Sequence, residues 1–104
     1  MQNDRVLSFL GLMRKAGKIS VGEMNTEKSV RLKKAIIIIL ASDASPNAVK
    51  RAHSLSEAAE CDLVIVPADK DTLGRALGAS PFAMAAICDS GFAKAFHSII
   101  NQRD

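Results

Sequence analysis

The chain has 104 residues, a net charge of +3 and a mean hydropathy of +0.11. This length fits one compact domain, so we expect residues 1–104 to form a single domain. Hydrophobic residues make up 48% of the chain and charged residues 24%, which excludes a wholly disordered or low-complexity protein. No apolar run reaches the roughly 18 residues that span a membrane, and residues 1–13 lack the pattern of a signal peptide. We therefore expect a cytoplasmic protein with no membrane partner.

The N-terminal segment is predicted to form a helix and then a short strand. Asn3 or Asp4 is expected to cap the helix, and Gly17 is expected to end it. The apolar stripe of this helix, at helical spacing, consists of Val6, Phe9, Leu10 and Met13. Residues 18–21 read as a short edge strand, and we expect that strand to run antiparallel to the others.

The middle of the chain is predicted to hold the centre of the sheet. Gly22 breaks the first strand, and residues 23–32 read as a second helix. Residues 35–41 read A-I-I-I-I-L-A, an apolar run without alternation, which predicts a central strand covered on both faces. Ser45 is then expected to cap a third helix with Pro46 at its first position. The apolar face of that helix consists of Ala48, Ala52, Leu55 and Ala59.

The second half of the chain continues the alternation. Residues 61–66 are predicted to form a second buried strand, and residues 82–88 a third. Between them Asp69 is expected to cap a short helix that ends at Gly78.

A last helix, capped by Asp89 or Ser90, completes the chain. The resulting order of elements predicts an α/β fold, a three-layer α/β/α sandwich with a four-stranded mixed sheet and right-handed crossovers between parallel neighbours.

Residues that could support catalysis are few. His53 and His97 lie in predicted helices without a Ser, Cys or carboxylate at the spacing of a catalytic pair. Asp43 and Asp89 follow buried strands, where open α/β folds place ligand residues, but both precede helix starts, and capping explains them. Neither a phosphate-binding loop nor a G-x-G-x-x-G motif is present. We therefore expect a protein that is not an enzyme.

The two cysteines show no pattern of a metal site or a redox motif. Cys61 and Cys88 are far apart in the sequence, with no C-x-x-C pair. We therefore expect both cysteines to be buried and reduced. We expect no bound metal and no cofactor.

Positive charge is concentrated in the first third of the chain. Residues 1–34 carry eight basic and three acidic groups, whereas residues 35–104 carry six basic and eight acidic groups. Such a basic segment suggests a polyanion as partner, and a solvated helix face is the alternative. The chain has no Tyr or Trp, and its four Phe lie mostly in apolar patterns, which argues against an aromatic platform for single-stranded bases.

The second predicted helix carries the residues best suited to RNA. It starts after Gly22, and a helix N-terminus offers N–H groups and a positive dipole end to a phosphate. Asn25, Lys28 and Arg31 recur at every third position of this helix. Asn and Glu side chains can contact base edges, while Lys and Arg hold the phosphate backbone. On residue types alone, RNA binding and a solvated amphipathic helix remain equal alternatives.

Several short motifs in a fixed order resemble a known family. They are L-G-L-M-R-K-A-G-K (10–18), G-E (22–23), K (28), L-A-S-D-A-S (40–45), L-G-R-A-L-G (73–78) and D-S-G-F-A-K (89–94). Together they resemble the bacterial YlxQ group of the kink-turn RNA-binding superfamily, which includes the archaeal protein L-seven-Ae and the eukaryotic L-thirty-e. The resemblance implies an α/β/α sandwich and non-catalytic binding of RNA with a sharp bend built around sheared G·A pairs. In that family the glycine-started helix meets those pairs, and a loop before the last strand covers the protruding bases.

The resemblance assigns roles to residues by position. Gly22 matches the motif glycine, Lys28 the motif lysine, and Lys18 a basic residue ahead of the motif. The best-known members have G-x-N-E, whereas this chain has Met24 and Asn25 at the last two positions, so Asn25 stands where the glutamate is expected. The expected RNA-binding residues are Lys18, Gly22, Glu23, Asn25, Lys28, Arg31, Ser80, Pro81 and Phe82.

The expected partner is ribosomal or other structured RNA of the kink-turn type, and through it the ribosome, bound by a monomer. The main alternative is a protein–protein adaptor linked to the translation machinery. The RNA hypothesis requires the amino end of the second helix and the loop before the last strand to share one positively charged face.

Overall fold

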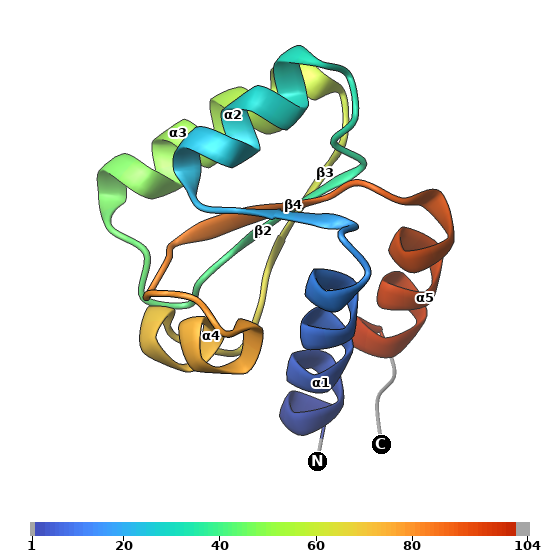
Figure 1. The fold of residues 1–104 in the computed structure, drawn as a ribbon. Coiled ribbons are helices and arrows are strands. Elements are labelled where there is room, and N and C mark those ends of the chain that lie inside the picture. The colour runs from blue at the N-terminus through green and yellow to red at the C-terminus, as the bar shows by residue number, and fades with distance from the viewer. Residues whose placement is uncertain (1, 102–104) are drawn as a thin grey trace.

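The computed structural model describes residues 2–101 (Figure 1). The elements within this range are α1 (Gln2–Lys15), β1 (Ile19–Val21), α2 (Glu23–Arg31), β2 (Ile37–Leu40), α3 (Pro46–Ala59), β3 (Asp62–Ile65), α4 (Lys70–Leu77), β4 (Met84–Ile87) and α5 (Ser90–Ile100). Helices α2 and α3 cover one face of the sheet, and α1, α4 and α5 cover the other (Figure 1). The predicted three-layer sandwich with a four-stranded mixed sheet is confirmed. No helix in residues 2–101 has both the length and the apolar character needed to cross a membrane.

The isoleucine run of β2 supplies both halves of the core. Ile37 and Ile39 pack into the apolar cluster under α1, α4 and α5, whereas Ile38 and Leu40 pack into the cluster under α2 and α3. All four side chains are almost fully buried. Successive residues of a strand point to opposite faces, so only an apolar run without alternation can serve two cores at once. The prediction of a central strand is therefore confirmed.

The direction of the strands differs from the expectation. The sheet order is β1-β4-β2-β3, and β4 runs antiparallel to both of its neighbours, so β4 rather than β1 is the strand of opposite direction. The cause lies in α4. The N–H groups of Ala41 and Ser42, directly after β2, donate to the carbonyls of Ala83 and Ala68, which flank the α4 segment. The chain therefore leaves β3 and enters β4 at the same end of the strands, beside Leu40, and β4 must run back.

Strand β3 and the two cysteines are less buried than predicted. Because β3 is an edge strand, it lacks a neighbour on one side, and the Ile65 side chain is 63% exposed. Cys61 and Cys88 are free thiols, and each is half-buried rather than buried. Partial burial, together with the Asp62 carboxylate, raises the pKa of the Cys61 thiol.

Helix caps follow the sequence with two exceptions. The side chains of Ser45, Asp69 and Asp89 cap α3, α4 and α5, as expected, by accepting a hydrogen bond from a first-turn N–H group. Asp43 does not cap the helix after it: its Oδ1 accepts from the N–H of Lys70 at the start of α4, 2.9 Å away. Helix α1 already contains residues 3 and 4, so neither Asn3 nor Asp4 is its cap.

Gly74 fixes the position of the loop that connects α4 to β4. A Cβ atom at Gly74 would lie 2.9 Å from the Ala79 oxygen, the Ser80 carbonyl carbon and the Pro81 nitrogen. Atoms at this distance overlap, and all three belong to backbone, which cannot rotate away. The segment Ala79–Phe82, called here the 79–82 loop, therefore rests directly on the backbone of α4.

Gly74→Ala should push the 79–82 loop off α4 and lower the free energy of unfolding by about 1–3 kcal/mol, the usual cost of overpacking. Chemical denaturation measures this loss. Gly91→Ala is the matched control, because the added Cβ would meet one side-chain oxygen, Oδ2 of the capping Asp89, at 3.2 Å, and no backbone atom at that range. The control should change the free energy of unfolding by less than about 1 kcal/mol, because the gain in helix propensity offsets a small shift of that carboxylate. Equal stability of the two variants would contradict a close loop contact.

Candidate functional site

Antiparallel pairing of β1 with β4 joins two segments that are distant in the sequence. The N–H of Gly22 donates to the carbonyl of Met84 at 2.9 Å, in line with the register that pairs Val21 with Ala85. Gly22 directly precedes α2, and Met84 begins β4, with only Ala83 between it and the 79–82 loop. One hydrogen bond thus holds the amino end of α2 beside the loop that enters β4, at the left end of the sheet in Figure 1.

These segments enclose an open hollow of about 490 Å³. Its walls come from the end of α1, from β1, from the start of α2 and from the 79–82 loop. The residues that line it, which define the α2–loop hollow, are Arg14, Ile19, Ser20, Val21, Gly22, Asn25, Ala79, Ser80, Pro81 and Phe82. Five of the nine residues predicted for RNA binding therefore meet in one place: Gly22, Asn25, Ser80, Pro81 and Phe82.

The wall formed by β1 is an exposed sheet edge. Gly22 and Lys18 make the hydrogen bonds to β4, so the alternation of an antiparallel pair turns the N–H and C=O groups of Ile19 and Val21 away from β4. The Val21 carbonyl accepts from Nδ2 of Asn25 at 2.9 Å. This bond fixes the Asn25 side chain at the rim of the hollow and leaves its Oδ1 as an exposed acceptor.

The amino end of α2 has no side-chain cap. Gly22 occupies the N-cap position with φ 95° and ψ 161°, a backbone conformation that is essentially reserved for glycine. Helices α3, α4 and α5 each have a Ser or Asp cap that accepts from a first-turn N–H, whereas the N-cap residue of α2 is a glycine, so the first N–H groups of that helix donate to no cap side chain. Those N–H groups and the positive end of the helix dipole face outward beside the hollow, where an anion would be stabilised.

The predicted basic residues lie around the hollow rather than in it. Lys28 is exposed one turn beyond Asn25 and about 60° from it around the helix axis, whereas Arg31 is about 120° from Asn25. Lys18 directly precedes β1, about 13 Å from Gly22 along the strand direction. Lys28 therefore flanks the hollow, and Lys18 and Arg31 lie further out.

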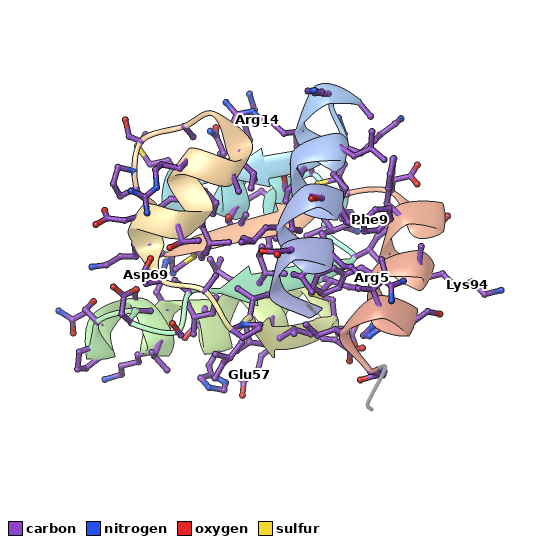
Figure 2. All side chains as sticks on the ribbon, turned by 90° about the horizontal axis from the view of Figure 1, so that it is seen from below. Arg5, Phe9, Arg14, Glu57, Asp69 and Lys94 are labelled. Atoms are coloured by element: carbon purple, nitrogen blue, oxygen red, sulfur yellow. The ribbon has the colours of Figure 1, made fainter. Side chains whose placement is uncertain are left out.

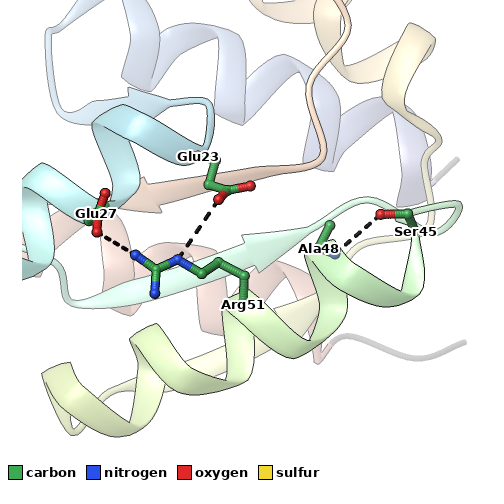
Figure 3. Close-up of polar contacts among 5 residues, drawn as sticks. All are labelled: Glu23, Glu27, Ser45, Ala48 and Arg51. Atoms are coloured by element: carbon green, nitrogen blue, oxygen red, sulfur yellow. Dashed lines mark hydrogen bonds and ion pairs between the residues drawn. The ribbon is translucent and has the colours of Figure 1, made fainter.

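Glu23 points away from the hollow. Its carboxylate lies 3.8 Å from Nε of Arg51 on α3, and Glu27 accepts a hydrogen bond from the same guanidinium (Figure 3). Arg51 thus draws both carboxylates of α2 toward α3. Glu23 was predicted to contact RNA. This ion pair instead holds its side chain on the side of α2 that faces α3.

Phe82 does not present its aromatic ring to the hollow. Its side chain is 7% exposed and belongs to the core, whereas Ser80 and Pro81 are exposed. The loop side of the hollow is therefore formed by the tip at Ser80 and Pro81.

Two polar residues of the hollow, Arg14 and Ser20, were not among the predicted site residues. Arg14 supplies the charge in the lining of the hollow. In the sequence it is an ordinary cation in the last turn of α1, so only the folded structure identifies it as a site residue. Ser20 lies at the base of the hollow, and its Oγ is 2.6 Å from Oγ of Ser29 on α2. Cys88 Sγ lies 3.5 Å from the same Ser29 oxygen, so this polar cluster attaches α2 to β1 and β4.

Both histidines lie outside the hollow. His97 pairs with Asp62 at 3.1 Å between α5 and β3, outside the residues that line the hollow, and His53 is exposed on α3. Among residues 2–101 no cluster of three or more His, Cys, Asp or Glu side chains could hold a metal ion.

The fold and the hollow define a small α/β/α sandwich domain with an uncapped helix terminus beside a loop. The chain belongs to the Ribosomal protein L7Ae/L30e/S12e/Gadd45 family, whose model matches residues 4–97. The predicted resemblance is confirmed by curated relatives named RNA-binding protein YlxQ. The Bacillus subtilis relative is 31% identical and the alignment covers 89% of this chain and 92% of that protein; the Enterococcus faecium relative is 30% identical, covering 92% and 91%.

Solved structures show the same fold. A Bacillus halodurans protein of unknown function superposes with a TM-score of 0.83 at 27% identity, covering 93% of this chain and 97% of that one. A Giardia lamblia 15.5kD RNA binding protein superposes with a TM-score of 0.72 at 24% identity, covering 96% of this chain and 86% of that one.

Gly22→Asn should lower the free energy of unfolding by about 1–3 kcal/mol, because asparagine at this position must adopt a backbone conformation that residues with a side chain avoid. Gly17→Asn is the matched control. The N–H of Gly17 and that of Lys18 bond back to Arg14 and Met13, which makes Gly17 the left-handed residue of a Schellman motif, a position that Asn tolerates. Denaturation should show a clearly smaller loss for the control; equal losses would contradict the special backbone at Gly22.

Proposed function

We propose that this protein is a non-catalytic, cytoplasmic RNA-binding protein that recognises structured RNA of the kink-turn type. The α2–loop hollow and the exposed start of α2 form the contact surface. The observation that carries this proposal is the meeting of Gly22, Asn25 and the 79–82 loop around one polar hollow beside an uncapped helix terminus. The names of the YlxQ relatives and of the Giardia protein support an RNA partner.

Each part of the surface has a chemical task. The first N–H groups of α2 and the dipole hold a phosphate or an acceptor edge of a base. Asn25 accepts a base N–H at Oδ1, while its bond to the Val21 carbonyl keeps the amide from rotating. Because Gly22 has no side chain, RNA can approach the strand-to-helix turn closely.

The shape of the site favours bent RNA over a regular duplex. A-form RNA hides its base edges in a deep, narrow major groove, whereas bends and internal loops expose them. The hollow is bounded on its far side by the tip of the 79–82 loop, where Ser80 and Pro81 are exposed and can cover a base that protrudes from the bend. We propose ribosomal or other structured RNA as the ligand, bound by a monomer.

The proposal is tested by comparing one kink-turn RNA with a straight duplex of equal length at several salt concentrations. Tighter binding of the bent RNA, retained as salt rises, is expected, because base contacts at the hollow add to the phosphate contacts. Equal weak binding of both RNAs would contradict the proposal and would favour an adaptor that meets the translation machinery through protein contacts.

Lys28→Ala should weaken binding of the kink-turn RNA and reduce the slope of log affinity against log salt by about 1, because one phosphate contact is lost. Salt titration by gel shift or fluorescence anisotropy measures the slope. Lys94→Ala is the matched control: Lys94 is an exposed lysine that projects from α5, away from the hollow (Figure 2). An unchanged slope for Lys28→Ala would remove Lys28 from the contact surface.

Asn25→Ala should weaken binding of the same RNA with little change in the salt slope, because the lost contact is to a base edge and releases no counterion. The expected cost is about 1–3 kcal/mol, as for a lost base contact. Asn47→Ala, on the neighbouring helix α3, controls for the loss of an exposed amide. An affinity as high as that of the Asn47→Ala control would remove Asn25 from the contact surface.

A further inference from the structure

A second hollow adjoins the first one on the other side of Arg14. It lies between α1 and α4, has a volume of about 500 Å³, and is called here the α1–α4 groove. Its main lining residues are Gly11, Leu12, Arg14, Lys15, Arg75 and Gly78. Arg14 lines both hollows, and Figure 2 shows it at the end of α1 beside the turn that leaves α4. The α2–loop hollow and the groove therefore adjoin at Arg14.

The floor of the groove exists because two helix backbones approach closely. A Cβ atom at Gly11 would lie 2.9 Å from the carbonyl oxygen of Ala76. No side chain therefore fills the space between the helices at this level, and the longer side chains of Lys15 and Arg75 stand at its sides.

The charge of the groove has one sign. Arg14, Lys15 and Arg75 line it, and none of its lining residues within 2–101 is acidic. All three are exposed, and in the described part of the chain none of them hydrogen-bonds to or pairs with a carboxylate. The Arg75 charge helps to lower the pKa of Asp69, but the main cause is the hydrogen bond from Thr72, and Asp69 caps the opposite end of α4 (Figure 2).

We propose that the α1–α4 groove is a second RNA contact, which holds the sugar–phosphate backbone of a helix that flanks the bound bend. This inference rests on the proposed function and extends it. One strand of the flanking helix leaves the α2–loop hollow past Arg14 and enters the groove, where Lys15 and Arg75 neutralise its phosphates. Three exposed cations with no carboxylate among them attract a polyanion, and because Arg14 lines both hollows, we take that polyanion to be part of the same RNA.

A structural role for the same cations is distinguishable. Lys15 and Arg14 lie in the last turn of α1, and Arg75 lies in the last turn of α4, where cations favour the helix dipole by about 0.3–1 kcal/mol. That role affects only the stability of the protein. A phosphate contact also changes the salt dependence of RNA binding, which the dipole does not.

The experiment uses Lys15→Gln/Arg75→Gln, which leaves Arg14 and the α2–loop hollow intact. Its control, Lys50→Gln/Lys94→Gln, removes the same charge from α3 and α5. Each protein is titrated with a kink-turn RNA that has two full flanking helices and with two versions in which one helix or the other is cut back to the bend. With the full RNA, the groove variant should show a salt slope lower by about 2 than that of the wild type and the control.

Shortening one particular helix should abolish that difference, while the wild type still prefers bent to straight RNA. An unchanged slope for the groove variant on the full RNA would overturn the inference and leave the proposed function intact. An equal loss on all three RNAs would place these cations at the bend itself and would also overturn it. If the wild type has no preference for the bend, the proposed function fails independently of the groove.

Discussion

The candidate site depends on one antiparallel pairing, that of β1 with β4. Strand β1 is only three residues long, yet its bonds to β4 place Gly22 against Met84 and thereby bring the start of α2 beside the 79–82 loop. This is possible because β4 runs opposite to the other strands. Helix α4 returns the chain to the end of the sheet at which β3 finishes, so β4 starts from that end. A parallel β4 would begin at the opposite end of the strands, and the loop before it would then lie far from the start of α2.

The packing of α2 against α3 then determines which charges the surface presents. Helix α2 has acidic and basic side chains in nearly every turn, but Arg51 draws Glu23 and Glu27 toward α3. Lys28 stays on the side nearer to the loop, and Arg14 approaches from α1. The local field at the hollow is therefore more positive than the sequence of α2 suggests, although the partly exposed ion pairs themselves contribute little to stability.

The sequence predicted what depends on local patterns. Four isoleucines in a row indicated a doubly covered strand, and Ser45 and Asp69 indicated their helices, because burial on two faces and N-capping leave short-range signatures. The direction of β4 was not predictable, since it depends on contacts between distant parts of the chain, such as the hydrogen bond from the Ala41 N–H to the Ala83 carbonyl. The motif around Gly22 and the loop were found by resemblance, but the diversion of Glu23 by Arg51 and the place of Arg14 required the tertiary contacts.

The central claim is that the start of α2 and the 79–82 loop contact RNA together. Backbone amide resonances of the labelled protein, followed by nuclear magnetic resonance during titration with a kink-turn RNA, test it most directly. The account predicts that the amides of Glu23, Met24 and Asn25 shift in parallel with those of Ser80 and Phe82, at the same RNA concentrations. Shifts confined to β3 and α5, with both of these segments unchanged, would contradict it.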